Sequence, residues 1–231
     1  MTEKLILEKI DNTAQITINN PSANTWDLES LSGLQEIIEN LNKDDNIFAL
    51  VITGQGDKFF SAGADLKVFH EGGKEAAKEM SNAFSEAFES LSNFRGVSIA
   101  AINGFAMGGG LECALACDIR VAEEKAVLAL PEPKVGLLPC GGGTQVLPRL
   151  VGEGWAKRII LTGEQIKAEQ ALKIGLIEEK VQEDAREKSQ VLQQQTAVIV
   201  ELSNFIFSHL GLPIEPGTIP GVGEASKLMH K

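Results

Sequence analysis

The chain has 231 residues, 43% hydrophobic and 23% charged, which is ordinary for a globular protein and excludes disorder or a coiled coil as a description of the whole chain. Its 32 acidic residues outnumber 21 basic ones, and the formal charge of −11 disfavours nucleic acid and anionic membranes as partners, because both are bound mainly through Lys and Arg. The longest apolar stretch, residues 97–111, is interrupted by polar residues and glycines and is too short for a membrane span, which needs ~20 apolar residues.

The sequence contains three cysteines, Cys113, Cys117 and Cys140. An odd, sparse set indicates a reducing compartment, and with no leader-like segment at the N-terminus we expect a cytoplasmic protein. Cys113 and Cys117 lie four residues apart in an apolar run, which favours buried helix side chains over metal ligands. The three histidines have no ligand spacing to one another, so we expect no metal site.

Apolar periodicity predicts the elements in chain order. Alternating residues predict a β-hairpin over residues 5–10 and 15–19, and Thr25 or Asp27 is suited to cap the helix that follows. Strands that alternate with helices then indicate the α/β class. The further expected elements are buried strands at 48–53 and 97–102, a loop at 59–65, a helix at 75–91, a helix opened by glycines 108–110, short strands at 118–122 and 126–130, a turn region at 131–139, helices from 144, at 154–161 and at 168–174, and a last strand at 177–181.

Two glycine-containing segments follow predicted strands. Small residues at 59–65 let the backbone approach a ligand closely, although a tight turn at Gly63 explains the same pattern. Glycines 108–110 place bare N–H groups at a helix N-terminus, which favours an anion or a developing oxyanion. The alternative is a dinucleotide-binding fingerprint, but the match is poor because Cys113 replaces the last small residue and the motif lies mid-chain.

Two glutamates stand out as candidate acids. Glu112 lies in an apolar helix of small residues, where a carboxylate is costly to bury without a reason. Glu132 lies between two prolines, which restrict its backbone. The alternative is an ordinary surface or ion-paired role, with Lys125 and Lys134 as the candidate partners.

Four blocks, in order, resemble the crotonase, or enoyl-CoA hydratase/isomerase, superfamily. A resemblance in four ordered blocks is more specific than any single glycine loop, and it extends over about residues 3–181. The blocks are FSAGADL at 60–66, AINGFAMGGGLE at 101–112, CDIRVA at 117–122, and residues 131–145 with PE, GLLP and GGTQ.

The resemblance implies a spiral of repeated ββα units that binds an acyl-CoA thioester. Residues 1–181 would form this core, and residues 182–231 a divergent, shortened C-terminal helical segment. Coenzyme A would be part of the substrate, with no separate cofactor. A homotrimer or hexamer is expected, with an apolar stripe at 198–210 as a subunit contact.

The resemblance also implies site roles. The N–H groups of Ala64 and Gly109 would hold the thioester oxygen as it becomes an enolate. Ala62, Asp65 and Leu66 would contact coenzyme A.

The two glutamates occupy both acid positions of the hydratase branch. Glu112 would accept a proton from water, and Glu132 would donate one to C2. The expected reaction is hydration of a trans-2-enoyl-CoA to a 3-hydroxyacyl-CoA. Double-bond isomerisation and a non-catalytic acyl-CoA-binding or partner-binding role remain as alternatives.

Overall fold

The N-terminal region forms a hairpin and a capped helix. A computed structural model of the chain describes residues 2–182 and 184–190. Strands β1 (Leu5–Ile10) and β2 (Thr13–Ile18) pair antiparallel across a turn in which Asp11 has a φ of 52°. Asp27 caps α1 (Leu28–Leu41) because its side chain accepts from the backbone N–H of Ser30, while the Ser30 hydroxyl accepts from the N–H of Asp27.

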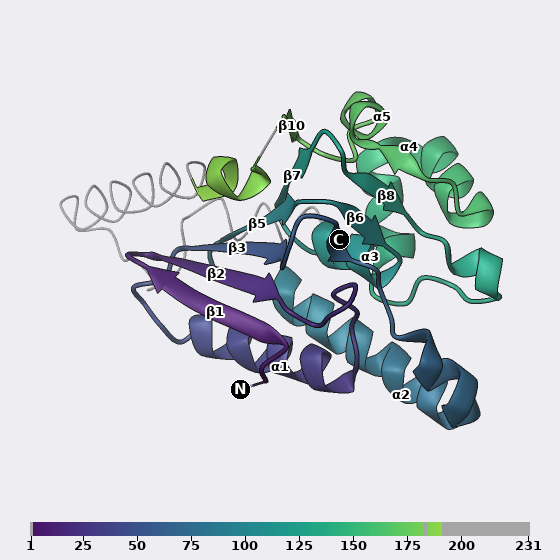
Figure 1. The fold of residues 1–231 in the computed structure, drawn as a ribbon, viewed down its shortest axis with the longest axis horizontal. Helices are drawn as coiled ribbons and strands as arrows, with labels where there is room; N and C mark the ends of the chain where they lie inside the picture. The colour runs from purple at the N-terminus through teal and green to yellow at the C-terminus, as the bar shows by residue number, and fades with distance from the viewer. Residues whose placement is uncertain (1, 183, 191–231) are drawn as a thin grey trace, which may run out of the picture.

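Three consecutive units then repeat one plan: a strand in a six-stranded sheet, a three-residue strand in a four-stranded sheet, and a helix. This plan confirms the expected spiral of ββα units (Figure 1). The units are β3 (Ala49–Gly54), β4 (Phe59–Ser61) and α2 (Leu66–Ser92); β5 (Val97–Ile102), β6 (Phe105–Met107) and α3 (Gly109–Leu115); and β7 (Ile119–Glu123), β8 (Val127–Ala129) and α4 (Gly143–Thr162).

The last elements return the chain from the small sheet to the large one. Strand β9 (Ile166–Lys167) pairs with β8, helix α5 (Ala168–Lys173) follows, and β10 (Glu179–Val181) pairs with β7. The strand orders are β1-β2-β3-β5-β7-β10 and β4-β6-β8-β9. None of the described helices is both long and apolar enough to cross a membrane.

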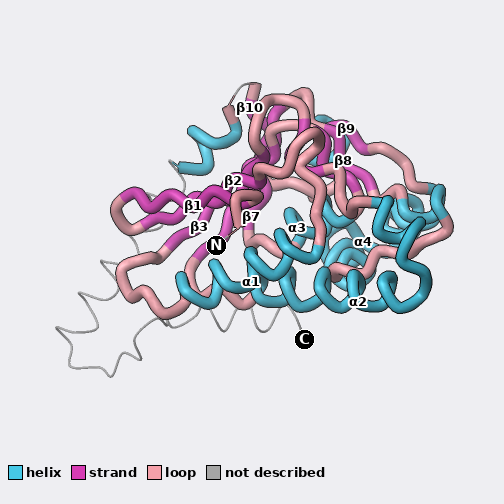
Figure 2. The backbone as a smooth tube through the Cα atoms, turned by 60° about the horizontal axis from the view of Figure 1, so that its bottom comes forward, coloured by secondary structure: helices cyan, strands magenta, loops and turns pink. Residues whose placement is uncertain are grey.

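Both faces of the large sheet are covered. Helices α1 to α4 lie on one side, and the short helical segment at 185–190 lies on the other (Figures 1 and 2). Leu50 and Ile52 belong to the main core, whereas Val51 belongs to a second cluster with Ala185. Burial on both faces explains why the inner strands are continuous apolar runs in the sequence.

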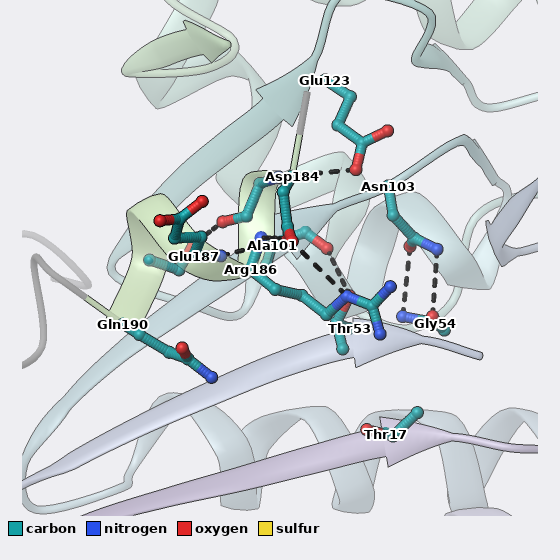
Figure 3. A network of polar contacts seen from close by, with 12 residues as sticks. Thr17, Thr53, Gly54, Ala101, Asn103, Glu123, Asp184, Arg186, Glu187 and Gln190 are labelled. Atoms are coloured by element: carbon teal, nitrogen blue, oxygen red, sulfur yellow. Dashed lines mark hydrogen bonds and ion pairs between the residues drawn. The ribbon is translucent and has the colours of Figure 1, made fainter. Parts of the chain in front are cut away.

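Polar contacts join the sheet to the segment at 184–190 and to the neighbouring loops (Figure 3). The side chain of Glu123 accepts a hydrogen bond from the N–H of Ala185 at 3.4 Å. Asn103 donates to the carbonyl of Gly54 at 2.9 Å and accepts from its N–H at 3.2 Å. The described part of the predicted C-terminal segment therefore packs on the core, and the apolar stripe at 198–210 lies outside the described residues.

Some predicted boundaries are wrong. The expected loop at 59–65 contains β4, and β6 lies where only a glycine turn was expected; three-residue strands are too short to show a period. Helix α2 begins at Leu66, before a break at Gly73, where φ is 66°. The expected turn at 131–139 contains the 3₁₀ helix η1 (Glu132–Val135), and the two helices expected between 144 and 161 are one element broken at Gly152.

A buried arginine ties β7 to the segment before β10, and this contact predicts a stability effect. Arg120 is 2% exposed, donates to the carbonyls of Cys117 and Leu176, and pairs with Glu178. Arg120→Met should lower the free energy of unfolding by about 2–4 kcal/mol, because two buried carbonyls lose their donors. In urea unfolding, Glu178→Gln should cost less than Arg120→Met, since the amide oxygen still accepts from Arg120 and the side chain at 178 is partly solvated; equal losses would contradict this explanation.

Candidate active site

A cavity of about 420 Å³ lies between the turn after β4, the start of α3 and the segment at 131–140. The motif residues come from three separate units of the spiral, yet they meet here. Five of the seven predicted site residues line this cavity: Ala62, Ala64, Gly109, Glu112 and Glu132.

Two backbone N–H groups in the cavity wall have no backbone partner among residues 2–182 and 184–190. Ala64 pairs with Trp26 as in a parallel sheet, but the bonds run from the Trp26 N–H to Gly63 at 2.8 Å and from the Asp65 N–H to Trp26 at 3.0 Å. The N–H of Ala64 is therefore left free for another acceptor. Gly109 begins α3, so its N–H has no acceptor within the helix.

The turns that carry these N–H groups touch each other. Gly63 has a φ of 86°, which a side chain disfavours. A Cβ atom at Gly63 would lie 2.6 Å from the carbonyl oxygen of Met107 and 3.2 Å from the nitrogen of Gly109. Glycine at this position thus permits both the turn and the close approach of the two loops.

Glu112 is a buried carboxyl group held by backbone N–H groups. Its side chain projects from α3, and Oε1 accepts from the N–H of Gly141 and of Gly143, both at 2.8 Å. Burial raises the pKa of Glu112, and the backbone donors oppose that shift. The suggested ion pair with Lys125 is wrong, because Lys125 pairs with Glu123 at 2.9 Å.

Glu132, at the start of η1, lines the same cavity as Glu112. A Cβ atom on Gly108 would lie 2.7 Å from Oε1 of Glu132, so the carboxyl group packs on the turn before α3. Its Oε2 is buried and has no hydrogen-bond partner among the described residues. Burial, with a smaller contribution from the charge of Glu112, raises the pKa of Glu132 to about 7. Lys134, the candidate ion-pair partner, is exposed at the cavity rim.

Asp65 and Leu66, the remaining predicted contacts, belong to the segment that follows Ala64. Asp65 is half-buried beside the cavity, and Leu66 begins α2. Contact of Ala62, Asp65 and Leu66 with coenzyme A stays a prediction.

Several residues in or beside the cavity were not predicted. Gly141 and Gly143 are not among its lining residues, but their N–H groups hold Glu112, and the sequence shows them only as part of a glycine run. Phe84 and Ser81 on α2 carried no signal beyond helical spacing. Cys140 lines the cavity, and burial raises the pKa of its thiol to about 11.

The other two cysteines are placed as expected. Cys113 and Cys117 are buried in and just after α3. The described residues contain no group of three or more His, Cys, Asp or Glu side chains that could hold a metal ion.

The fold and the cavity define an α/β protein with two carboxyl groups and free backbone donors in one site. Residues 8–210 match the family model described as enoyl-CoA hydratase/isomerase. The chain is 38% identical over 205 residues to the short-chain-enoyl-CoA hydratase of Clostridium acetobutylicum (86% of this chain, 78% of that one). It is 40% identical over 181 residues to the crotonyl-CoA hydratase of Syntrophomonas wolfei (78% and 70%).

Among solved structures, DspI of Pseudomonas aeruginosa is similar over 98% of this chain and 94% of that one, at 56% identity and a TM-score of 0.84. The chain belongs to the enoyl-CoA hydratase/isomerase, or crotonase, family, and it is a crotonase-family enzyme. Membership in this family accounts for glycines 108–110, so we drop the alternative that they form a dinucleotide-binding fingerprint.

The raised pKa of Glu132 predicts a pH-dependent cost in stability. The ordinary pKa is 4.5 and the folded value about 7, so between these pH values the unfolded chain ionises Glu132 while the folded protein keeps it protonated. Stability of the wild type is lost as pH rises through this window, whereas Glu132→Gln does not titrate. From about pH 4.5 to 7.5 the variant should gain about 2–3 kcal/mol relative to wild type. Urea unfolding at both pH values measures this difference, and a constant difference would contradict the assignment.

Proposed function

We propose that the protein is an enoyl-CoA hydratase that adds water across the double bond of a trans-2-enoyl-CoA to give a 3-hydroxyacyl-CoA. The observation that carries the proposal is the pair of carboxyl groups, Glu112 and Glu132, facing one cavity with two free backbone donors. The names of the two hydratase relatives support the same reaction. In this proposal coenzyme A is part of the substrate, and no separate cofactor takes part.

The free N–H groups of Ala64 and Gly109 are proposed to bind the thioester oxygen. Attack of water at C3 moves negative charge onto that oxygen, so the intermediate is an enolate. Fixed donors aimed at the developing charge stabilise the transition state more than the ground state. Because both donors are backbone groups held by the turns around Gly63 and Gly108, they need little reorganisation during the reaction.

The two carboxyl groups are proposed to divide the proton transfers. Glu112 accepts N–H donation on one oxygen, which opposes the rise in pKa that burial causes, and this supports a role as base towards the attacking water. Glu132, with a pKa of about 7, holds a proton in a large fraction of molecules at neutral pH and suits donation to C2. Water gives its oxygen to C3 and one proton to Glu112, C2 gains the proton of Glu132, and exchange with solvent restores both acids.

Isomerisation of a 3-enoyl-CoA is the second candidate, because a single carboxyl group with a pKa near neutrality can move a proton between carbons. A homotrimer or hexamer, and a cytoplasmic location, remain predictions.

The glutamate pair gives the first kinetic test. Glu112→Gln and Glu132→Gln keep the side-chain shape but remove the ionisable group, so each should lower kcat for crotonyl-CoA hydration by ~10²–10⁴-fold. Affinity for a saturated acyl-CoA should change by less than ~3-fold, since neither carboxyl group is assigned to binding. If Glu132→Gln hydrates at the wild-type rate, the two-acid mechanism is wrong, and turnover of a 3-enoyl-CoA would favour isomerisation.

A second test removes one backbone donor. Ala64→Pro deletes the N–H, so kcat should fall by roughly 10²–10³-fold, the usual effect of losing one oxyanion donor. Ala64→Ser keeps the N–H and is the matched control, expected within ~5-fold of wild type. Circular dichroism and melting temperature check that the proline variant is folded; a folded proline variant with the activity of the serine variant would remove Ala64 from the site.

A further inference from the structure

Three buried aromatic side chains lie behind the cavity in edge-to-face contact. Trp26, Phe84 and Phe88 are each at most 2% exposed. The ring centroids are 5.7 Å apart for Trp26 and Phe88 and 5.5 Å apart for Phe84 and Phe88. We call these three residues the aromatic cluster; only Phe84 among them lines the cavity.

Phe84 packs directly against the backbone of Gly109. A Cβ atom on Gly109 would lie 2.5 Å from Cε1 and 2.9 Å from Cζ of the Phe84 ring. The ring edge therefore occupies the space where any side chain at position 109 would stand. Movement of this ring would shift the start of α3 and the N–H of Gly109 with it.

Phe88 packs in the same way against the backbone that holds Glu112. A Cβ atom on Gly141 would lie 2.6 Å from Cδ2 of Phe88 and 3.2 Å from Oε2 of Glu112. The N–H of Gly141 is one of the two donors to Glu112. The Phe88 ring thus sets how closely this donor approaches the carboxylate.

Trp26 connects the same cluster to the turn that carries Ala64. Its backbone forms the two hydrogen bonds that flank Ala64, one to the carbonyl of Gly63 and one from the N–H of Asp65. Its indole ring contacts Phe88. The position of the indole is therefore linked to the position of the Ala64 N–H.

We propose that the aromatic cluster positions the reacting groups, fixing the N–H groups of Ala64 and Gly109 relative to Glu112. This inference rests on the proposed function for the roles of those groups. The three backbone segments belong to different units of the spiral, and the cluster is the packed layer that touches all of them. The residues act through the backbone and need not contact the reacting atoms, apart from the cavity wall that Phe84 provides.

Ordinary core packing explains the cluster less well. The indole Nε1 of Trp26 is buried and has no hydrogen-bond partner among residues 2–182 and 184–190. A buried donor without a partner costs stability, and phenylalanine would fill part of this space without that cost. A residue kept only for stability would be expected to avoid this defect.

The test compares the central ring of the cluster with a core ring outside the cluster. Phe88→Leu removes the shared contact, and Phe94→Leu removes a phenylalanine of the main core, 7% exposed, as the matched control. With crotonyl-CoA well below both melting temperatures, Phe88→Leu should lower kcat by ~10-fold or more with little change in KM, because small misplacements of reacting groups lower rates steeply. Phe94→Leu should stay within ~2-fold of wild type. Trp26→Phe is a milder second variant in case Phe88→Leu does not fold.

A binding measurement separates positioning from general loosening, and it does not require turnover. Acetoacetyl-CoA can bind as an enolate with charge on its oxygens, whereas butyryl-CoA cannot. Calorimetry should show that Phe88→Leu, or Trp26→Phe, reduces the preference for acetoacetyl-CoA over butyryl-CoA by ~5–10-fold, because the oxyanion donors are displaced, with no such change in Phe94→Leu.

The two measurements also separate this inference from the proposed function. A wild-type protein that does not hydrate enoyl-CoA, but whose cluster variants lose the acetoacetyl-CoA preference, would refute the hydratase and support the positioning role. An unchanged preference in both cluster variants, or losses that only follow the drop in melting temperature in all three variants, would overturn the inference.

Discussion

The cavity contains two carboxyl groups that are largely shielded from water and form no ion pair with any described residue. The groups that stabilise such a site are backbone N–H groups, not charged side chains. Glu112 is satisfied by N–H groups of the glycine run that precedes α4. Glu132 has no such donors on its buried oxygen, and its raised pKa is the result. Burial thus raises the pKa of both carboxyl groups, and at Glu112 the N–H groups of the glycine run oppose that rise.

The spiral explains how the backbone donors reach one place. In each of its three units the connection from the short strand to the helix contains a glycine with positive φ: 86° at Gly63, 53° at Gly108 and 105° at Gly142. Because these connections leave the same end of the neighbouring parallel strands β4, β6 and β8, amide groups from three distant segments come together. The repeat is therefore one of geometry, which is why the sequence itself shows no sustained internal repeat.

The sequence was sufficient for features that depend on local pattern. The hairpin, the Asp27 cap and the inner strands follow from alternation, capping chemistry and continuous apolar runs. Motif blocks whose order resembles that of the family predicted four residues of the cavity, Ala64, Gly109, Glu112 and Glu132. In contrast, β4 and β6 are fixed by pairing with each other and with β8, and a three-residue strand has no readable period.

Tertiary contacts account for the site features that local pattern could not predict. The acceptor of the Gly141 and Gly143 N–H groups lies 29 or more positions earlier in the chain, at Glu112. Trp26 and Phe84 are separated by a strand of each sheet, so their common contact with Phe88 could not be inferred from spacing. The pKa of Glu132 likewise depends on burial, which its flanking prolines alone do not set.

The cavity presents backbone N–H groups at Ala64 and Gly109 and side-chain groups at Glu132 and Cys140. This difference has an evolutionary consequence. A point substitution other than proline leaves an N–H group in place at Ala64, and the close approach of Phe84 leaves no room for a side chain at Gly109. The proposed hydrogen bonds to the thioester oxygen therefore do not depend on which side chain stands at position 64, but they do depend on glycine at position 109. Glu132 and Cys140, by contrast, line the cavity with their side chains, which single substitutions can replace. In the proposed mechanism, replacement of Glu132 would change the reaction while the backbone donors to the thioester oxygen stay in place.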